Sequence, residues 1–329
     1  MNILIVKFGA LGDVVRTSYI LPGLKKKYPR SKIFWFTSEI SSQLIDSNFM
    51  VNKIFTPKNQ QNLKTIKFDY VISLDDELEI LKTLRSLGIE VDVGSYEDQN
   101  GNASYTDNSS LWFDMGLISS LGKEEADRLK KKNNLEHNDI LSRILDIDID
   151  EPHFCEDISL HPLDERFTDR FFKIGLNLGA GERWPSKKLR MTEAVELVRE
   201  LKKMRIKEKN TQIYLLGGES EKGMNQALEG KFSKELVNTG HLNTLKEFAK
   251  IISSMDLIIS SDSLALHLAI AQKIKTVSFF SPTSSAEIGT FGTGIKLKSL
   301  SDDYCSYVPN ADNSTITAER IIKGIKSII

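Results

Sequence analysis

A segment near the N-terminus combines two glycines with a carboxylate where an apolar run gives way to a helical pattern. It reads KFGALGDVVRT over residues 7–17. Asp13 falls in the first turn of the expected helix, where a carboxylate complements the helix dipole. At the mouth of a sheet, the same carboxylate also suits a general base that accepts a proton from a substrate hydroxyl. Lys7, Gly12 and Arg16 lie around it, and a junction of strand, glycine and helix is a favourable place for an anion.

Two more loops carry glycines directly after strand-like runs. The first reads NLGAGERWPSKK over residues 177–188. Its glycines would let backbone N–H groups approach a phosphate, and its Lys or Arg side chains would supply the countercharge. The second reads LGGE and ends in Glu219, whose carboxylate could accept hydrogen bonds from a ribose diol. Taken alone, each loop also fits a solvated connection or an ordinary glycine turn.

The pattern SSDSLALHLA over residues 260–269 follows a buried strand and opens a helix. It delivers Asp262 and Ser263 to the helix N-terminus, where Ser263 is expected as the N-cap residue. His267 falls four residues later, on the same side of the helix as Ser263. Free N–H groups, a hydroxyl and an imidazole could therefore converge on a diphosphate, although a histidine in such a helix is also often a packed core side chain.

The junction FSPTSSAE over residues 280–287 follows the next strand and again offers hydroxyl groups, among them that of Thr283. Ser284 and Glu287 have the spacing of a capping box. The segment is therefore expected to begin a helix, and capping alone would explain its composition.

Several other familiar kinds of site are missing. Residues 7–17 have neither the G-x-G-x-x-G fingerprint nor the Gly-Lys-Ser/Thr of a P-loop, which disfavours an NAD-dependent oxidoreductase. The five histidines form no H-x-x-x-H or H-E-x-x-H pair, and no G-x-S-x-G elbow occurs. We therefore expect neither a bound metal nor another cofactor.

The candidate residues all follow runs that predict β-strands, with helical patterns between them. Strands alternating with helices indicate βαβ units, which build parallel sheets with right-handed crossovers. Ligands then bind at the carboxyl ends of the strands, where loops meet helix N-termini. In the first half, the expected strands are residues 3–6, 33–36 and 70–74, and the expected helices are residues 12–27, 39–46 and 77–86. In the second half, the expected strands are residues 172–177, 213–216, 257–260 and 276–280, with helices that include residues 192–204 and 244–253.

The length and the middle of the chain indicate two domains. A chain of 329 residues corresponds to about two domains of roughly 150 residues. The stretch 133–171 has the weakest pattern, with Pro152 and Pro162 as breakers. We expect two Rossmann-like, doubly wound α/β domains facing a cleft, followed by an amphipathic helix. Their expected ranges are residues 1–165 for the N-terminal domain, 166–316 for the C-terminal domain and 317–329 for the helix.

The composition argues against several classes of protein. Lys plus Arg total 44 and Asp plus Glu total 45, and the net charge of −1 disfavours a nucleic-acid partner. No apolar run approaches the roughly 20 residues that cross a bilayer, and the N-terminus resembles a strand more than a signal peptide. Two isolated cysteines, Cys155 and Cys305, suit a reducing compartment. We therefore expect a cytoplasmic protein, and the basic run at residues 25–32 is compatible with peripheral contact with the inner membrane.

In their order along the chain, these motifs resemble those of the heptosyltransferase family of glycosyltransferases, which extend the lipopolysaccharide core. The family opens with a strand and an apolar-Gly-Asp-Val turn, which residues 3–17 match. Its second-half signature, Asp-Ser/Thr-x-x-x-His-x-Ala, is matched by residues 262–269, and its aromatic-x-Pro-Thr segment by residues 280–283. Leu264 departs from the pattern, since many members have glycine at that position.

The resemblance implies a GT-B fold, a metal-independent inverting transfer and an ADP-heptose donor. Asp13 then matches the catalytic base, Lys187 the lysine that stabilises the departing diphosphate, and Glu219 the position that holds the ribose. The other implied donor-side residues are Lys188, Asp262, Ser263, Leu264, His267 and Thr283, and those on the acceptor side are Lys7, Gly12 and Arg16.

The sequence thus predicts an enzyme that moves heptose or a related sugar from an ADP-sugar to a lipopolysaccharide-core or other glycan or glycolipid acceptor. A nucleotide-sugar epimerase of similar fold is one alternative, and it would consume the donor without any acceptor. A non-catalytic relative that only binds nucleotide or glycan is another. The presence of Asp13, Lys187 and His267 argues against such a binding protein, which needs no base at the cleft.

Overall fold

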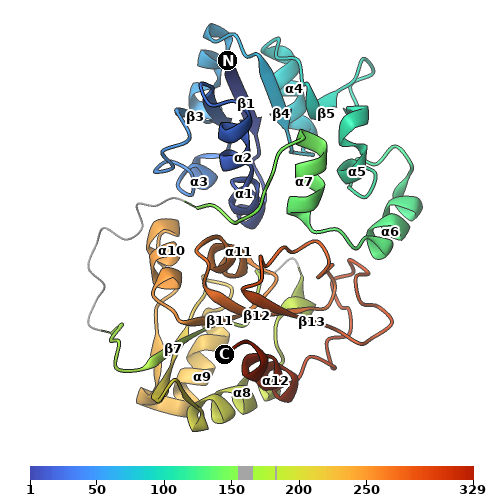
Figure 1. Ribbon diagram of the computed structural model, residues 1–329. Coiled ribbons are helices and arrows are strands. Elements are labelled where there is room, and N and C mark those ends of the chain that lie inside the picture. Colours follow the sequence, from blue (N-terminus) through green and yellow to red (C-terminus); the bar gives the residue numbers. More distant parts are fainter. Residues whose placement is uncertain (155–165, 182–183) are drawn as a thin grey trace. The chain divides into compact units, whose positions relative to one another are not determined.

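The structure, a computed structural model, describes residues 1–154, 166–181 and 184–329. The chain forms two compact units, Met1–Asp157 and Ile158–Ile329, and each contains its own sheet (Figure 1). The domain boundary predicted after residue 165 adjoins residues 155–165, which lie outside the described part of the chain. The same holds for residues 182 and 183 of the predicted phosphate loop.

The sheet of the first unit has the strand order β3-β2-β1-β4-β5-β6. All neighbours pair in parallel except β5 and β6, which pair antiparallel. The central strand β1 is an apolar run whose last four residues are fully buried, as expected for a parallel strand covered on both faces. The strands are β1 (Asn2–Val6), β2 (Lys32–Phe36), β3 (Lys53–Phe55), β4 (Tyr70–Ser73), β5 (Val93–Glu97) and β6 (Ala103–Tyr105).

The helix predicted over residues 12–27 is divided in two by Ser18 and Tyr19, so that α1 and α2 are separate. The hydroxyl of Ser18 donates to the carbonyl of Val15 at 2.6 Å and lies 2.9 Å from the carbonyl of His153. A hydroxyl that bonds back onto the preceding turn competes with the regular helical ladder. The prediction of one continuous helix was therefore wrong at a position where a tertiary contact decides the backbone.

Two other helices of the first unit differ from the prediction. The helix expected over residues 39–46 ends at Ser42. A further helix, α7, lies within the region that the sequence marks as weakest, and a capping box of Glu136 and Asp139 begins it. The helices are α1 (Leu11–Thr17), α2 (Ile20–Lys27), α3 (Glu39–Ser42), α4 (Leu78–Ser86), α5 (Ser110–Phe113), α6 (Lys123–Lys132) and α7 (His137–Leu145), with the 3-10 helices η1 (Pro57–Thr65) and η2 (Asp107–Ser109).

The sheet of the second unit has the order β10-β9-β7-β11-β12-β13, and these strands all pair in parallel. A short strand, β8, pairs antiparallel with β9 at its beginning. Strands β7 and β11, the two central strands, are buried along their whole length. The strands are β7 (Phe172–Asn177), β8 (Arg205–Ile206), β9 (Lys209–Leu215), β10 (Leu236–Asn238), β11 (Leu257–Ser261), β12 (Lys275–Phe280) and β13 (Gly294–Lys298).

The helices of the second unit pack on this sheet through apolar faces. The terminal helix α12 buries Ile321 and Ile325 completely, in one core cluster with Val198 and Leu201 of α8 and with the strands. The C-terminal helix is thus part of the second unit's core. The helices are α8 (Met191–Lys203), α9 (Lys222–Phe232), α10 (Leu245–Ser253), α11 (Leu264–Ala271) and α12 (Ala318–Ile328), with the 3-10 helices η4 (Pro185–Lys187) and η5 (Ser233–Glu235).

Each sheet has a point at which its strand order reverses. In the first unit this point lies between β1 and β4, and in the second unit between β7 and β11. The loops that leave two such strands run to opposite sides, which opens a crevice for ligands at the carboxyl ends of the strands. The loops carrying Asp13, Lys187 and Asp262 all begin at these ends.

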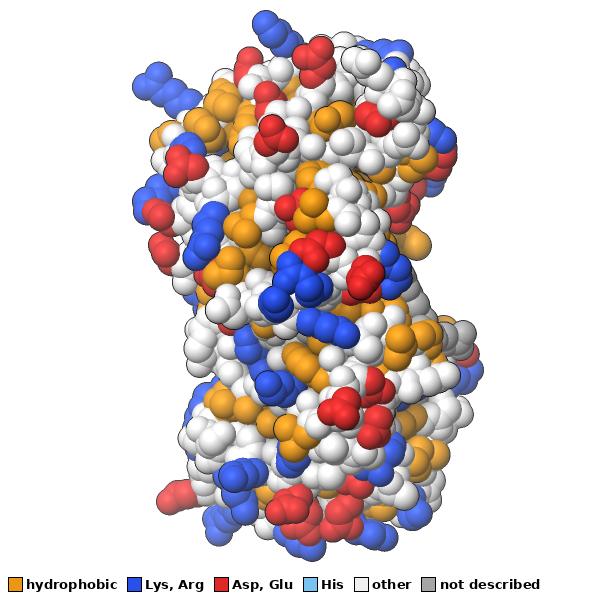
Figure 2. Space-filling model, turned by 90° about the vertical axis from the view of Figure 1, so that its right-hand side faces the viewer, with side chains coloured by type: hydrophobic (Ala, Val, Ile, Leu, Met, Phe, Trp, Pro, Cys, Tyr) orange, Lys and Arg blue, Asp and Glu red, His pale blue; other side chains and the backbone are white. Residues whose placement is uncertain are grey.

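The surface carries mixed charge. On the face shown in Figure 2, basic and acidic side chains lie interspersed, in keeping with the net charge of −1. Large apolar side chains such as Leu117 and Leu242 are exposed singly, as is normal for a folded protein. Among the helices that the structure describes, none has the length and apolar character needed to span a membrane.

Candidate functional site

In the first unit, Asp13 lies in the first turn of α1, just beyond the end of β1. Its side chain is 34% exposed, and its Oδ1 lies 2.9 Å from Nη2 of Arg16, one turn along the helix. The guanidinium holds the carboxylate of Asp13, a group that can serve as a general base, in one position. Arg16 is itself held over the ring of Trp112, 5.5 Å from the centroid, and Gly12 is buried. Gly12, Asp13 and Arg16 therefore lie together in the first unit, at the start of α1.

Lys7, the third predicted acceptor-side residue, reaches the loop after the neighbouring strand β4. Its Nζ donates to a backbone carbonyl there at 3.0 Å and lies 3.8 Å from Oδ2 of Asp75. Asp75 is almost fully buried, and it accepts hydrogen bonds from the backbone N–H groups of Phe8 and Gly9. Lys7 and Asp75 thus tie the loop after β4 to the loop that leads into Asp13.

Two carboxylates that the sequence motifs did not single out, Asp75 and Asp76, lie in the loop after β4. Burial raises the pKa of Asp76; the charge of Lys7 opposes this, whereas those of Asp75 and Asp13 reinforce it. A shifted carboxyl group among functional candidates is a common property of catalytic sites. The available signal was a pair of aspartates shortly after a buried strand, at the carboxyl end of the sheet.

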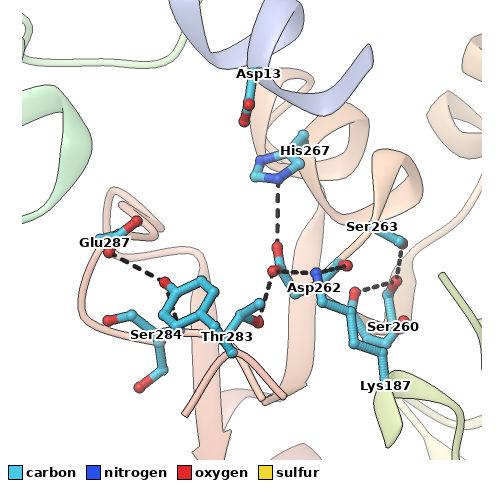
Figure 3. Close-up of polar contacts among 12 residues, drawn as sticks. Asp13, Lys187, Ser260, Asp262, Ser263, His267, Thr283, Ser284 and Glu287 are labelled. Atoms are coloured by element: carbon cyan, nitrogen blue, oxygen red, sulfur yellow. Dashed lines mark hydrogen bonds and ion pairs between the residues drawn. The ribbon is translucent and has the colours of Figure 1, made fainter. Parts of the chain in front are cut away.

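In the second unit, Asp262 is the centre of a cluster of side chains from three loops (Figure 3). Its Oδ2 accepts hydrogen bonds from Nζ of Lys187 at 2.7 Å and from the hydroxyl of Thr283 at 2.8 Å. Its Oδ1 lies 3.6 Å from Nε2 of His267. Lys187 also donates to the backbone carbonyl of Asp262 at 3.1 Å. Four predicted donor-side residues therefore meet at the carboxyl end of the sheet.

The charges of this cluster are largely removed from water. The side chains of Lys187 and Asp262 are 12% and 14% exposed. Burial acts to raise the pKa of Asp262, but the Lys187 ammonium and His267 outweigh it and hold this pKa well below its usual range. Asp262 is therefore a carboxylate that fixes the ammonium of Lys187 and the imidazole of His267.

We expect the stability contributed by Asp262 to depend on pH. Because its pKa is lower in the folded than in the unfolded chain, this contribution is complete above the unfolded value of about 3.9 and is lost as the pH falls below it. The difference in melting temperature between the unaltered protein and Asp262→Asn should therefore be largest near neutral pH and shrink as the pH falls below about 4. Thermal unfolding across this range measures it, and a difference that does not change with pH would contradict the assignment.

Lys187 and its neighbour Lys188 make different contacts. Lys187 ends η4, where its own N–H donates to the carbonyl of Trp184 at 3.0 Å. This turn directs the Lys187 side chain to Asp262. Lys188 instead contributes its backbone carbonyl to a hydrogen bond from Asn313. The sequence left both lysines as candidates, and the structure brings the ammonium of Lys187 into the cluster.

Ser263 occupies the N-cap position of α11, as predicted, but its side chain does not cap the helix. Its hydroxyl is bound by Nδ2 of Asn177 at 3.0 Å and lies 2.9 Å from the hydroxyl of Ser260. The predicted N-cap position is thus confirmed, whereas the hydroxyl contacts polar side chains of β7 and β11 in place of the helix N-terminus. The N–H groups in the first turn, which begins at the half-buried Leu264, are not taken up by this hydroxyl.

The capping box predicted at Ser284 and Glu287 is also wrong, because no helix follows β12 before β13 in the described chain. The hydroxyl of Ser284 accepts a hydrogen bond from the N–H of Ala286 at 3.2 Å, which forms a local turn. Glu287 is buried, and it accepts a hydrogen bond of 3.4 Å from the hydroxyl of Tyr307. The segment is thus a turn held by distant side chains.

The glycine turn after β9 contains two glutamates in different surroundings. Glu219, the predicted ribose residue, has a 68% exposed side chain that pairs with Lys222 at 3.0 Å and His241 at 3.3 Å. Lys222 and His241 also line a polar cavity of about 310 Å³. Glu221, which the sequence analysis missed, is buried and accepts hydrogen bonds from the N–H groups of Gly218 at 2.9 Å and Gly181 at 3.2 Å.

Glu221 also explains why this site needs glycine. A Cβ on Gly217, whose φ is +144°, would come within 2.4 Å of Glu221, and one on Gly179 within 2.7 Å. Gly181, with φ of +71°, faces open space. Two of the glycines therefore make room for a buried carboxylate, whereas Gly181 is favoured by its positive φ.

Solved structures share this architecture over nearly the whole chain. The glycosyltransferase family 9 protein of Veillonella parvula is 16% identical, with a TM-score of 0.69, and the match covers 99% of this chain and 96% of that one. The E. coli heptosyltransferase WaaC with ADP is 15% identical, with a TM-score of 0.69, and the match covers all of both chains. This likeness and the two doubly wound sheets confirm the predicted GT-B fold class.

Sequence comparison reaches the same group of proteins. The lipopolysaccharide heptosyltransferase 1 of Campylobacter coli is 24% identical over 373 aligned positions, which cover 100% of this chain and 99% of the relative. The model of glycosyltransferase family 9 (heptosyltransferase) matches residues 139–311, the range that holds Lys187, Asp262 and His267. The chain therefore belongs to glycosyltransferase family 9, the heptosyltransferase family, and is a glycosyltransferase.

Proposed function

We propose that this enzyme transfers heptose or a related sugar from an ADP-sugar to a lipopolysaccharide-core or other glycan acceptor, with inversion and without a metal. The cluster of Lys187, Asp262, His267 and Thr283 at the switch point of the second sheet carries the proposal. Related proteins support the choice of donor and acceptor, since the Campylobacter coli relative is named a lipopolysaccharide heptosyltransferase. E. coli WaaC has been solved with ADP and with ADP-2-deoxy-2-fluoro heptose.

On the donor side, we assign the departing diphosphate to Lys187. The ammonium is already fixed in a site that excludes most water, and a preorganised charge in such a site stabilises developing negative charge strongly. Asp262 holds the ammonium of Lys187 in place, and His267 and the hydroxyl of Thr283 complete the polar wall. No cofactor other than the donor enters this scheme, because the lysine supplies the positive charge at the leaving group.

On the acceptor side, we assign the general base to Asp13. Its carboxylate would take the proton from the acceptor hydroxyl as that oxygen forms a bond to the anomeric carbon. The bond between this carbon and the diphosphate oxygen breaks in the same displacement, and attack opposite the leaving group inverts the anomeric configuration. Arg16, at 2.9 Å, holds the carboxylate of Asp13 in position. We place the reaction at the cytoplasmic face of the inner membrane.

The two glutamates of the glycine turn should contribute unequally to donor binding. Glu221→Gln replaces a buried carboxylate that joins two loops. The loss of a charged hydrogen bond costs about 1.5 kcal/mol or more. We therefore expect the donor KM to rise about tenfold. Glu219→Gln alters exposed ion pairs, which contribute about 0–1 kcal/mol. Donor KM values measure both effects. A larger rise for Glu219→Gln would instead assign the ribose to Glu219, as the sequence resemblance implies.

A transfer assay read by mass spectrometry tests the proposal as a whole. ADP-heptose and other nucleotide sugars are offered with a panel of lipid A–Kdo type acceptors, with and without EDTA. We expect an acceptor that gains one heptose, with release of ADP, at a rate that EDTA does not change. Conversion of the ADP-sugar without acceptor would indicate an epimerase. Inhibition by EDTA would refute the metal-independent mechanism, and absence of ADP-sugar binding by calorimetry would refute the donor.

A further inference from the structure

A segment between β13 and α12 returns across two of the loops that form the donor-side cluster. We call residues 299–316 the C-terminal strap. Its N–H groups at Cys305 and Tyr307 donate to the carbonyls of Ser281 and Pro282, at 3.0 and 2.9 Å. The C-terminal strap therefore holds the turn that carries Thr283, one of the groups bound to Asp262.

The same segment holds the turn that carries Lys187. Nδ2 of Asn313 donates to the carbonyl of Ser186 at 3.0 Å and to the carbonyl of Lys188 at 2.8 Å. The N–H of Ser186 in turn donates to the carbonyl of Pro309 at 3.2 Å. One side-chain amide thus binds the backbone carbonyls of the residues before and after Lys187.

The C-terminal strap is itself fixed in an unfavourable backbone conformation. Cys305 and Tyr307 have φ values of +60° and +54°, a region that residues other than glycine enter at a cost of about 1–3 kcal/mol each. The carbonyl of Asp312, next to Asn313, accepts hydrogen bonds from the hydroxyls of Ser281 and Ser299, both at 3.0 Å. Such strain persists where surrounding contacts over-determine the backbone, and it is concentrated at functional sites.

We propose that Asn313 is a positioning residue for Lys187: its amide sets the turn from which the ammonium reaches Asp262 and the donor diphosphate. The inference rests on the function proposed for Lys187. Both carbonyls that flank Lys187 accept from a single NH₂ group, so a shift of this amide moves the base of the lysine side chain. A misplacement of about 1 Å in a catalytic arrangement can cost about 10²-fold in rate.

The test uses the full chain with Asn313→Ala and Asn313→Asp, compared with Asn310→Ala. Asp has the size of Asn but no NH₂ group to donate, and Asn310 lies exposed in the same C-terminal strap. We expect both Asn313 variants to lower kcat/KM for the ADP-sugar by about 10²-fold, with cooperative thermal unfolding retained. Asn310→Ala should stay within about twofold, as surface substitutions usually do.

A double-mutant cycle with Lys187→Ala separates positioning from general destabilisation. If Asn313 acts through Lys187, adding Asn313→Ala to Lys187→Ala should lower kcat/KM by no more than about twofold further. Losses that multiply in the double variant would overturn the inference while leaving the role of Lys187 standing. If Lys187→Ala alone does not alter transfer, the proposed function of Lys187 fails instead. Loss of folding in both Asn313 variants would also overturn the inference, since the residue would then be structural.

Discussion

Replacing Asp13 by asparagine is expected to lower kcat for sugar transfer by about 10²–10⁴-fold, the usual contribution of a positioned general base. Asparagine keeps the shape of the side chain beside Arg16, but it cannot accept the proton of the acceptor hydroxyl. Because the donor-side groups belong to the second unit, the affinity for ADP should stay close to that of the unaltered enzyme. Steady-state transfer rates and calorimetric ADP binding measure the two quantities.

Asp107→Asn is the matched control for this substitution. Asp107 is an exposed aspartate in the first turn of η2, in the same unit as Asp13. Its replacement removes a negative charge from a comparable helical position without touching the loop after β1, so transfer should not change measurably. Retained turnover in Asp13→Asn would remove this residue from the mechanism, and an equal loss in both variants would indicate a charge effect on the whole unit.

Replacing Lys187 by alanine is expected to lower kcat by about 10²–10³-fold, the range observed when one preorganised group that stabilises developing charge is removed. The reason is specific to the leaving group. Without the ammonium, the diphosphate must depart beside the buried carboxylate of Asp262, which then faces it with no cation between them. The donor KM should also rise, because the ground state of the ADP-sugar carries the same diphosphate charge.

Two other lysines provide comparison variants for Lys187→Ala. Lys173 is a buried lysine in β7, 10% exposed, whose partner Asp169 is 92% exposed. Lys173→Ala removes a buried lysine away from the cluster and should leave kcat unchanged. Lys188→Ala tests the donor-binding role predicted for the neighbouring lysine, and we expect a smaller loss than for Lys187→Ala. Unchanged kcat and donor KM in Lys187→Ala would reject its assignment to the diphosphate. Rates for all three are compared at saturating and limiting ADP-sugar.

Much of the fold can be read from local patterns. The strands β1, β7, β11 and β12 contain short runs of apolar residues. Such runs are typical of strands that are buried on both faces of a parallel sheet. Strands with little apolar content, such as β5, which contains Gly94 and Ser95, cannot be recognised in this way. Helix interruptions such as that at Ser18 depend on a partner far along the chain, at His153.

The candidate site is likewise predictable from the sequence only in part. The sequence indicates that Asp13, Lys187, Asp262 and His267 lie in loops after strands, because glycines and helix starts mark those loops locally. It does not show that Lys187 contacts Asp262, since that hydrogen bond joins residues 75 positions apart. The sequence could not distinguish Glu221 from Glu219, because the two glutamates of this turn differ in burial. Burial is a property of the folded chain.

What the sequence determined by itself is the class of architecture and the loops that contain the candidate site residues, because strand burial and glycine turns are encoded over a few neighbouring residues. The tertiary structure alone decided which side chains in those loops meet. In the folded chain the ammonium of Lys187, and not that of Lys188, contacts Asp262. The hydroxyl of Ser263 binds neighbouring side chains and does not cap its helix. The tertiary structure also brought Asn313 to the turn of Lys187 across 125 positions. These outcomes depend on hydrogen bonds between distant segments, whose partners are brought within reach only when the sheet assembles.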